Sequence, residues 1–337
     1  MTDGRRASRK GNVRRASRRL LRPIALLLAG SSARFLRLTG RRAGIALVYH
    51  SLAERTGAPD LELVPPHGSK LFEAQLRHLA RTYRLVLAED LPDAVAQRRR
   101  GDRFPVAITF DDDLASHVGL ALPILLRHGV QATFFLTGAT LEGPQSFWWQ
   151  RLQNALESDP KRLAELLRSI GLEQAEVDLS AVHDLGLLIE RLEPGVREAF
   201  GEALRDSFGG PLEAGVSAEE VRALVEAGMA IGFHTRRHHV LPSLDEPALN
   251  AAFEEGRAEL ENPIGERIIV IAYPHGQADE RVSAAARSAG FETGFTGVGV
   301  PVGPDDDPLL LGRITPSHRS ARHLALQIAA ALLRARS

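Results

Sequence analysis

The sequence contains no cysteine. Disulfide bonds and thiolate metal sites are therefore excluded, and cysteine usage gives no indication of the redox compartment. Any metal site must be built from histidine and carboxylate side chains. The chain also lacks a G-x-S-x-G nucleophile motif and a G-K-[S/T] phosphate-binding motif, which excludes the enzyme classes that depend on them. Its apolar runs are all shorter than the about 20 residues that a membrane-spanning helix needs.

The formal net charge is zero, but the basic residues are concentrated near the N-terminus. Residues 1–42 contain twelve Arg and one Lys against the single acid Asp3, so the rest of the chain is acidic, with 29 basic and 41 acidic residues. We expect residues 1–42 to form a flexible, solvated leader. Binding of this leader to an anionic membrane surface is the alternative, and no specific nucleic-acid contact is expected.

The leader contains one apolar stretch, residues 20–30, flanked by arginines on both sides. A basic start, a leucine-rich centre and small residues after it are typical of a signal peptide. The flanking arginines are equally typical of an amphipathic segment at a membrane surface. We expect a cytoplasmic or membrane-peripheral protein, with export through an atypical signal segment as the alternative.

From residue 43 onward, apolar β-type runs alternate with segments of helical periodicity. Strands are predicted at 45–49, 83–87, 106–110, 130–136, 229–233, 267–272, 291–296 and 309–314, and helices at 70–82, 114–128, 218–227, 246–260 and 279–289. Repeated β-α units predict a parallel sheet, and about seven of them favour a closed barrel. Residues 43–337 are thus predicted to have an α/β fold, a parallel (β/α) barrel of the distorted, seven-stranded, TIM-like kind.

Residues 137–217 interrupt the alternation with a segment rich in Leu, Glu, Arg and Ala, which predicts a helical insertion. The insertion follows a strand, so we expect it at the rim of the barrel, as a lid or a wall of a cleft. It opens with Phe147, Trp148 and Trp149. These rings either stack on sugars or anchor the insertion to the barrel, and the sequence leaves both interpretations open.

An apolar, β-type run at residues 106–110 ends in three consecutive carboxylates, Asp111, Asp112 and Asp113. Mutual repulsion and desolvation make such a triplet costly unless a cation or a proton relieves it. Two histidines four residues apart, His234 and His238, follow another apolar run. On a helical turn this spacing places both imidazoles on one face, and with one carboxylate they make a site for Zn²⁺ or a similar divalent ion.

The candidate chemical groups all lie where a predicted strand ends: His50, Asp111, Asp112, His234 and Tyr273. The carboxyl ends of parallel barrel strands share one face, where the βα loops build active sites. We therefore expect these groups to converge on one site, although they are far apart in the sequence.

Three motifs in this order make the chain similar to the polysaccharide deacetylases of the NodB-homology class, carbohydrate esterase family four. Residues 109–113 read TFDDD where the family has T-F-D-D-G, and residues 234–238 read HTRRH where it has H-[S/T]-x-x-H. Residues 272–276, AYPHG, are similar to the third motif in its variant Y-P-Y-G. The resemblance extends roughly over residues 104–316, apart from the insertion.

The resemblance implies a metal-dependent hydrolase of carbon–nitrogen bonds that removes N-acetyl groups from a polysaccharide or glycan, with O-acetyl groups as the less favoured alternative. Asp112, His234 and His238 would bind the metal, which would be zinc, with cobalt or nickel as alternatives. Asp111 would be the general base, and the backbone N–H of Tyr273 would help to hold the oxyanion. The alternative function is that of a catalytically impaired, carbohydrate-binding relative.

The later motifs depart from the family pattern. The family's general-acid histidine lies in a motif L-x-L-H, whereas residues 311–318 read LGRITPSH, so His318 is the general acid expected from its region, with His50 and His275 as rivals. The arginine that orients the base before the third motif is replaced by Ala272. Asp113 stands where the family has glycine, and we expect it to add charge near the metal and to crowd it.

Overall fold

A computed structural model describes residues 35–141, 143, 147–172, 178–209 and 215–335. The interpretations of residues 20–30 and of most of the leader therefore lie outside the described residues. The described end of the leader is packed on the body of the protein, because the buried guanidinium of Arg98 donates to the backbone carbonyls of Arg37, Thr39 and Arg41. No helix in the described ranges is long and apolar enough to cross a membrane.

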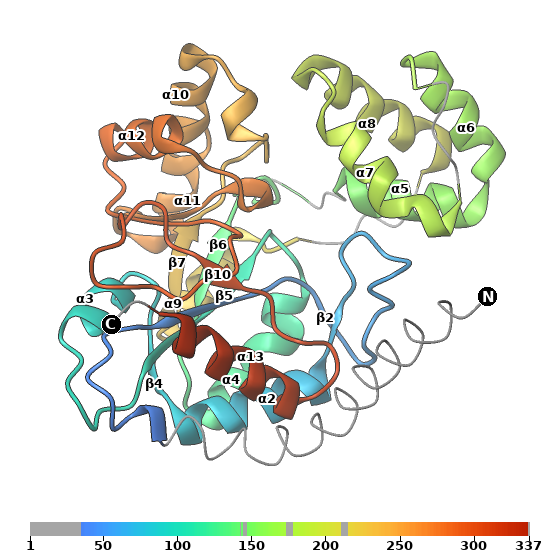
Figure 1. Ribbon diagram of the computed structural model, residues 1–337. Helices are drawn as coiled ribbons and strands as arrows, with labels where there is room; N and C mark the ends of the chain where they lie inside the picture. The colour runs from blue at the N-terminus through green and yellow to red at the C-terminus, as the bar shows by residue number, and fades with distance from the viewer. Residues whose placement is uncertain (1–34, 142, 144–146, 173–177, 210–214, 336–337) are drawn as a thin grey trace, which may run out of the picture.

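The predicted barrel is confirmed: parallel strands form one sheet that nearly closes (Figure 1). Seven of its strands follow one another in the order β10-β1-β5-β6-β7-β8-β9, and β4 pairs with the start of β5. A bridge between Phe295 of β9 and Leu311, just before β10, joins the two ends. The strands are β1 (Ile45–Tyr49), β4 (Arg84–Val86), β5 (Pro105–Asp111), β6 (Thr133–Leu136), β7 (Ala230–Phe233), β8 (Val270–Ala272), β9 (Thr293–Phe295) and β10 (Arg313–Ile314).

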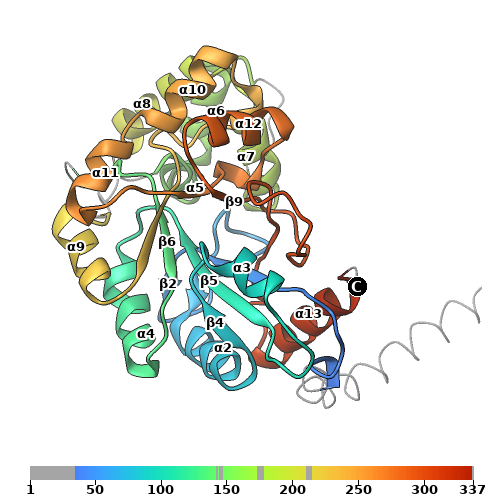
Figure 2. The same ribbon diagram turned by 90° about the vertical axis from the view of Figure 1, so that its left-hand side faces the viewer.

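The strands form where the sequence has nearly continuous apolar runs, as expected for strands covered on both faces. All seven residues of β5 are buried. Helices cover the outside of the sheet (Figure 2): α2 (Ser69–Thr82), α3 (Leu91–Ala96), α4 (Leu122–His128), α9 (Ala218–Glu226), α10 (Glu246–Glu254), α11 (Arg257–Ile264), α12 (Glu280–Ser288) and α13 (Ala321–Arg334). A small sheet of β2 (Leu52–Ala53) and β3 (His67–Gly68) follows β1.

Two predicted helices differ from the structure for local reasons. The helix predicted over 114–128 starts with a π-helical turn at His117–Ala121 before α4. The helix predicted over 246–260 is divided into α10 and α11, because Gly256 between them has a φ of 79°. This left-handed conformation is available to glycine without steric cost and ends the first helix.

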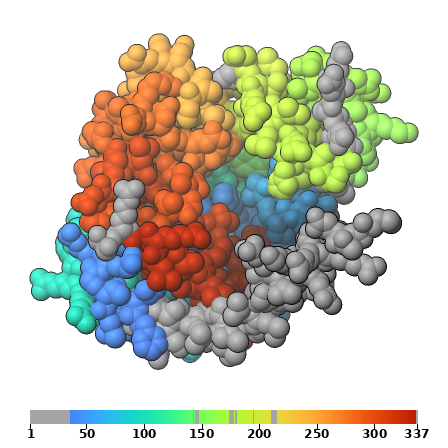
Figure 3. Space-filling view, viewed as in Figure 1, coloured from blue at the N-terminus to red at the C-terminus, as the bar shows by residue number. Residues whose placement is uncertain are grey.

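The predicted helical insertion forms a lobe beside the barrel, at the upper right in Figure 1. Its helices are α5 (Trp148–Ser158), α6 (Pro160–Ser169), α7 (Val182–Glu190) and α8 (Pro194–Phe208). The lobe has an apolar core of its own, made by residues such as Leu152, Leu163, Leu185 and Phe200. In Figure 3 the lobe and the region of α10–α12 stand on either side of a hollow above the barrel.

A candidate metal centre at the barrel rim

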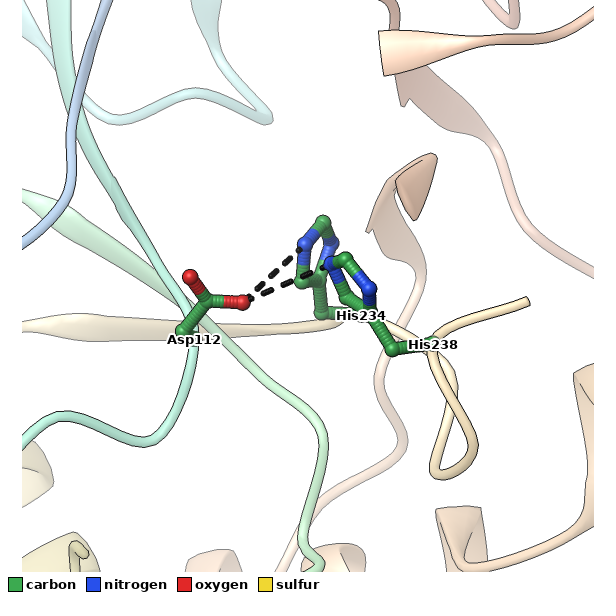
Figure 4. A group of neighbouring side chains, drawn as sticks. All are labelled: Asp112, His234 and His238. Carbon is green, nitrogen blue, oxygen red and sulfur yellow. Dashed lines mark ion pairs between the residues drawn. The ribbon is translucent and has the colours of Figure 1, made fainter. Parts of the chain in front are cut away.

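The carboxyl ends of β5 and β7 bring the predicted ligands together. Asp112 follows β5 and His234 follows β7, and both strands pair with β6. Oδ1 of Asp112 lies 3.6 Å from Nε2 of His234 and 3.6 Å from Nε2 of His238 (Figure 4). Within the described ranges, these three side chains form a group whose ligand atoms lie within 4.8 Å of one another.

Both histidines are in the state that a metal ligand requires. Nδ1 of His234 donates to the carbonyl oxygen of Ala272 at 2.8 Å, which leaves the lone pair of Nε2 facing Asp112. Burial lowers the pKa of His234 to about 4, and burial together with neighbouring positive groups lowers the pKa of His238 well below its usual value. Both rings are therefore neutral at pH 7.

Asp112 is the group that most needs a cation. Burial raises its pKa well above the usual range, and the charges of Asp111 and Asp113 add to the effect. Its Oδ1, which faces both imidazoles, has no hydrogen-bond partner in the described part of the chain. A bound divalent ion would compensate both costs. The separations of 3.6 Å are close to the about 3.4 Å between ligand atoms of a tetrahedral zinc site, so the three side chains fit such an ion.

The backbone at this site is strained. Four non-glycine residues of the described chain have positive φ angles, and all four lie here: Asp112 (73°), Thr235 (50°), His238 (49°) and His275 (58°). Such conformations cost about 1–3 kcal/mol each and persist only where the surrounding structure holds them. Their concentration at one place is the reason to treat it as a candidate functional site.

The expectation that His234 and His238 share a helical turn is wrong. Residues 234–240 contain no helix. A tight turn, in which the N–H of His238 donates to the carbonyl of Thr235 at 3.2 Å, reverses the chain and brings the two imidazole centroids to 5.0 Å. The left-handed residues Thr235 and His238 make this reversal, so the pair meets through a strained loop.

Asp111 is held by an arginine that no motif indicated. Arg313 of β10 donates from Nη1 to Oδ1 at 2.6 Å and from Nη2 to Oδ2 at 2.7 Å, and both side chains are buried. Burial alone would raise the pKa of Asp111, but the charge of Arg313, with that of His234 and the two hydrogen bonds, lowers it to about 2. Arg313 thus orients Asp111, the role for which the family has an arginine at the position of Ala272. The available signal was a charged residue inside an apolar strand, which is costly unless it is paired.

Asp113 does not crowd the metal cluster, contrary to expectation. Its carboxylate turns towards the start of the insertion, where it accepts hydrogen bonds from the N–H and hydroxyl of Thr137 at 2.6 and 2.8 Å and from those of Thr140 at 3.2 Å. The hydroxyl of Thr140 also lies 2.9 Å from the carbonyl of Val216, at the other end of the insertion. Asp113 therefore fastens the base of the insertion to the end of β5.

Replacement of Asp113 by Ala should lower the free energy of unfolding by about 2–4 kcal/mol, because buried N–H groups of Thr137 and Thr140 lose their acceptor. Asp113→Asn, which keeps one carbonyl acceptor and the shape, should lose less. Urea unfolding monitored by circular dichroism measures both. Equal stability of the parent and the Asp113→Ala variant would contradict this anchoring role.

Tyr273 does not have the free amide that its expected role requires. Its N–H donates to the carbonyl of Phe295 in β9 at 3.0 Å, and its hydroxyl donates to the carbonyl of Leu309 at 2.8 Å. The residue is fully buried. Tyr273 therefore joins strand ends together, and the sequence-based assignment to an oxyanion site is corrected.

A cavity of about 490 Å³ opens beside the cluster, and its lining includes His50, Asp111 and His275. His318, the expected general acid, is not among the lining residues; its ring packs against that of His67, with centroids 4.6 Å apart. The two rival histidines thus lie in the cavity, whereas His318 lies outside it.

The aromatic residues at the start of the insertion anchor it, as one of the two sequence-based interpretations predicted, and stacking on a sugar stays a prediction. Trp149 is buried, stacks on Phe147 with centroids 4.4 Å apart, and faces the ring of His238 at 5.2 Å. Trp148 packs against the core of the insertion. Both indoles also line the cavity, so they anchor the lobe and form a wall next to the cluster.

Comparison with known families agrees with these observations. The family described as polysaccharide deacetylase matches residues 98–184 and 185–294, which together make up more than half of the chain. No curated protein matches the chain in sequence.

Solved structures share the fold at low sequence identity. The Streptococcus pyogenes deacetylase PplD, solved in complex with acetate, is 17% identical with a TM-score of 0.58, over 86% of this chain and 98% of that one. IcaB from Ammonifex degensii is 18% identical with a TM-score of 0.54, over 86% and 97% of the two chains. A de-N-acetylase from Aggregatibacter actinomycetemcomitans is 17% identical with a TM-score of 0.54, over 82% and 96%.

Proposed function

Because the chain belongs to the polysaccharide deacetylase family, we propose that it hydrolyses N-acetyl groups of a glycan with the help of a divalent metal ion held by Asp112, His234 and His238. The observation that carries this proposal is the buried group of one carboxylate and two neutral imidazoles at the barrel rim. The metal would supply positive charge that polarises the acetyl carbonyl and makes water more acidic.

Asp111 is proposed as the general base. Its pKa of about 2 keeps it ionised at neutral pH, and Arg313 fixes the direction of both carboxylate oxygens. A carboxylate with so low a pKa is a weak base, so it requires water that has already been made acidic. His50 and His275, the two rivals of His318 expected from the sequence, both line the cavity and are our candidates to protonate the leaving amine.

A glycan substrate is supported by the composition of the cavity. Trp148 and Trp149 give the lining two large amphipathic rings, and acids and histidines supply its polar groups. Aromatic rings beside polar groups suit a sugar, whose faces are apolar and whose edges carry hydroxyl groups. The N-acetyl preference is our proposal, and among the solved structures of similar fold the de-N-acetylase supports it.

The test is metal content and acetate release in the same preparations. The parent should hold about one divalent ion per chain and release acetate from N-acetylated oligosaccharides, whereas a His234→Ala, His238→Ala double variant should lose both. His128→Ala is the matched control, because His128 pairs with Glu73 on the outer surface. Glycan binding by a metal-loaded parent that releases no acetate would instead favour the catalytically impaired, carbohydrate-binding relative.

A further inference from the structure

We propose that the helical insertion is a working part of the metal centre, with Arg197 and Glu190 as positioning residues for the ligand His238. This inference rests on the proposed function, in which His238 binds the metal. Neither residue touches the metal ligands' ring nitrogens; both act through the strained loop that carries His238.

The loop at His238 receives contacts from the insertion and from the turn after β8. Nη2 of Arg197, in α8, lies 3.5 Å from the carbonyl oxygen of His238 and 3.5 Å from that of Arg237. Nε2 of His275 lies 3.3 Å from the same His238 carbonyl. The φ of 49° at His238 is a conformation that persists only where such surroundings hold it.

The ring of His238 is enclosed in the same way. Its centroid lies 5.2 Å from that of Trp149 in α5 and 4.4 Å from that of His275. Rotation of the imidazole away from Asp112 is therefore restricted by an indole of the insertion and by a second imidazole. The insertion supplies contacts to both the backbone and the ring of one ligand.

A buried ion pair links these contacts. Oε2 of Glu190, the last residue of α7, lies 2.9 Å from Nη1 of Arg197 and 2.9 Å from Nε2 of His275. The side chains of Arg197 and Glu190 are only 7% and 12% exposed. Oε1 of Glu190 is buried without a hydrogen-bond partner in the described residues, so the pair does not maximise its own stability. Its clearest effect is to fix α7, α8 and the turn at His275 relative to the metal loop.

The turn at His275 has little freedom to adapt. Gly276 has a φ of 65°, and a Cβ atom there would lie 2.5 Å from the backbone of Gly297. This close approach locks the turn against the loop after β9. The backbone of the turn therefore cannot follow a displacement of Glu190. Such a displacement would instead disturb the contact of the His275 imidazole with Glu190, and with it the contact of the same imidazole with the carbonyl of His238.

The experiment compares metal binding by the full-length parent and by Arg197→Met, with cobalt as the probe. We expect cobalt affinity, measured by chelator competition, to fall about 10- to 100-fold, the usual effect of removing a group that orients a ligand. The visible d–d bands of bound cobalt should also change. Arg197→Lys should restore part of the affinity, because an ammonium can pair with Glu190 but cannot contact the carbonyl and the carboxylate together as a guanidinium does.

Arg205→Met is the matched control, since Arg205 lies on the same helix, is 55% exposed and pairs only with Glu202 and Asp206 in the described structure, at 3.9 and 3.8 Å. It should leave affinity and spectrum unchanged. If Arg197→Met does not fold, Glu190→Gln, which keeps the shape and removes the charge, should show the same loss to a smaller degree.

The outcomes separate this inference from the proposed function. If the parent binds cobalt and the folded Arg197→Met or Glu190→Gln protein has the same cobalt affinity and spectrum, the positioning role alone is overturned. A parent without cobalt affinity would overturn the metal site itself and this inference with it. Lower unfolding stability with an unchanged cobalt spectrum would show that the pair is only structural, and would also reject the inference.

Discussion

Asp111→Asn is expected to reduce the turnover of acetylated glycan by at least about 10²–10⁴-fold while leaving the metal bound. Asparagine is nearly isosteric with aspartate but cannot accept a proton from water. The ligand atoms of the proposed metal site belong to Asp112, His234 and His238, so the affinity for the metal should remain close to that of the parent. The loss should appear in kcat, because the substituted group acts in the chemical step.

The measurement is acetate release at saturating substrate, with metal content determined on the same samples. In Asp111→Asn the buried guanidinium of Arg313 faces a neutral amide in place of a carboxylate, which lowers stability. Thermal unfolding therefore has to confirm that the variant is folded. Asp60→Asn, at an exposed position, serves as the control. An Asp111→Asn protein that is folded, metal-loaded and as active as the parent would exclude Asp111 as the general base.

Arg313→Met is expected to lower the free energy of unfolding by about 3–5 kcal/mol, because removal of one partner leaves a buried carboxylate without its counter-charge. Both side chains are almost fully buried, at 2% and 4% exposure, so bulk water screens the remaining carboxylate only weakly. Activity should fall as well, since Asp111 loses the two hydrogen bonds that orient its oxygens.

The same variant should reverse one part of the pH dependence of stability. In the parent, the folded pKa of Asp111 of about 2 is below the unfolded value of about 3.9, so its contribution is present above pH 4 and is lost as the pH falls towards 2. Without Arg313, burial raises the folded pKa above the unfolded value. The contribution of Asp111 to stability should then decrease as the pH rises from about 4 through that raised pKa.

Urea unfolding of the metal-free proteins over a pH series measures this difference. Subtracting the parent curve from the variant curve removes the contributions of groups that titrate alike in both, such as exposed surface carboxylates. The charge of Arg313 also lowers the pKa of Asp112, so loss of Arg313 should shift Asp112 upward as well, in the same direction as Asp111. Arg287→Met is the control, because Arg287 is exposed and pairs with Asp307 at the surface. Parallel curves for the parent and Arg313→Met would show that Arg313 does not control the ionisation of Asp111.

The barrel could be predicted from the sequence because its signals are local. The run at 45–49 is β1, and the helices predicted at 218–227 and 279–289 differ from α9 and α12 only at their ends. Each such segment can be recognised from the period of its apolar residues. The three proposed ligands could be selected for a related reason: Asp112 lies at a strand end, and His234 and His238 lie within five residues of chain. Their meeting, however, depends on the pairing of β5 and β7 with β6 and on the strained turn at Thr235 and His238.

Other features of the site were decided by the tertiary structure alone. Asp111 and Arg313 are 202 positions apart and meet because β10 pairs with β1, which pairs with β5. The carboxylate of Glu190 reaches His275 only because the insertion folds back over the rim. The amide of Tyr273 was assigned to an oxyanion site from its motif, but in the structure this N–H donates to the carbonyl of Phe295.

By itself, the sequence determined the barrel, the helical insertion and the set of metal-ligand candidates. Their signals are the period of the apolar residues and the acidic or histidine side chains that follow apolar runs, and both can be recognised within short segments. Only the tertiary structure decided which groups contact the site residues. It brought Arg313 to Asp111 and the Arg197–Glu190 ion pair to the loop of His238, and it turned Asp113 away from the metal cluster. Such contacts depend on the pairing order of the strands and on how the insertion packs, and neither leaves a pattern in the neighbouring residues.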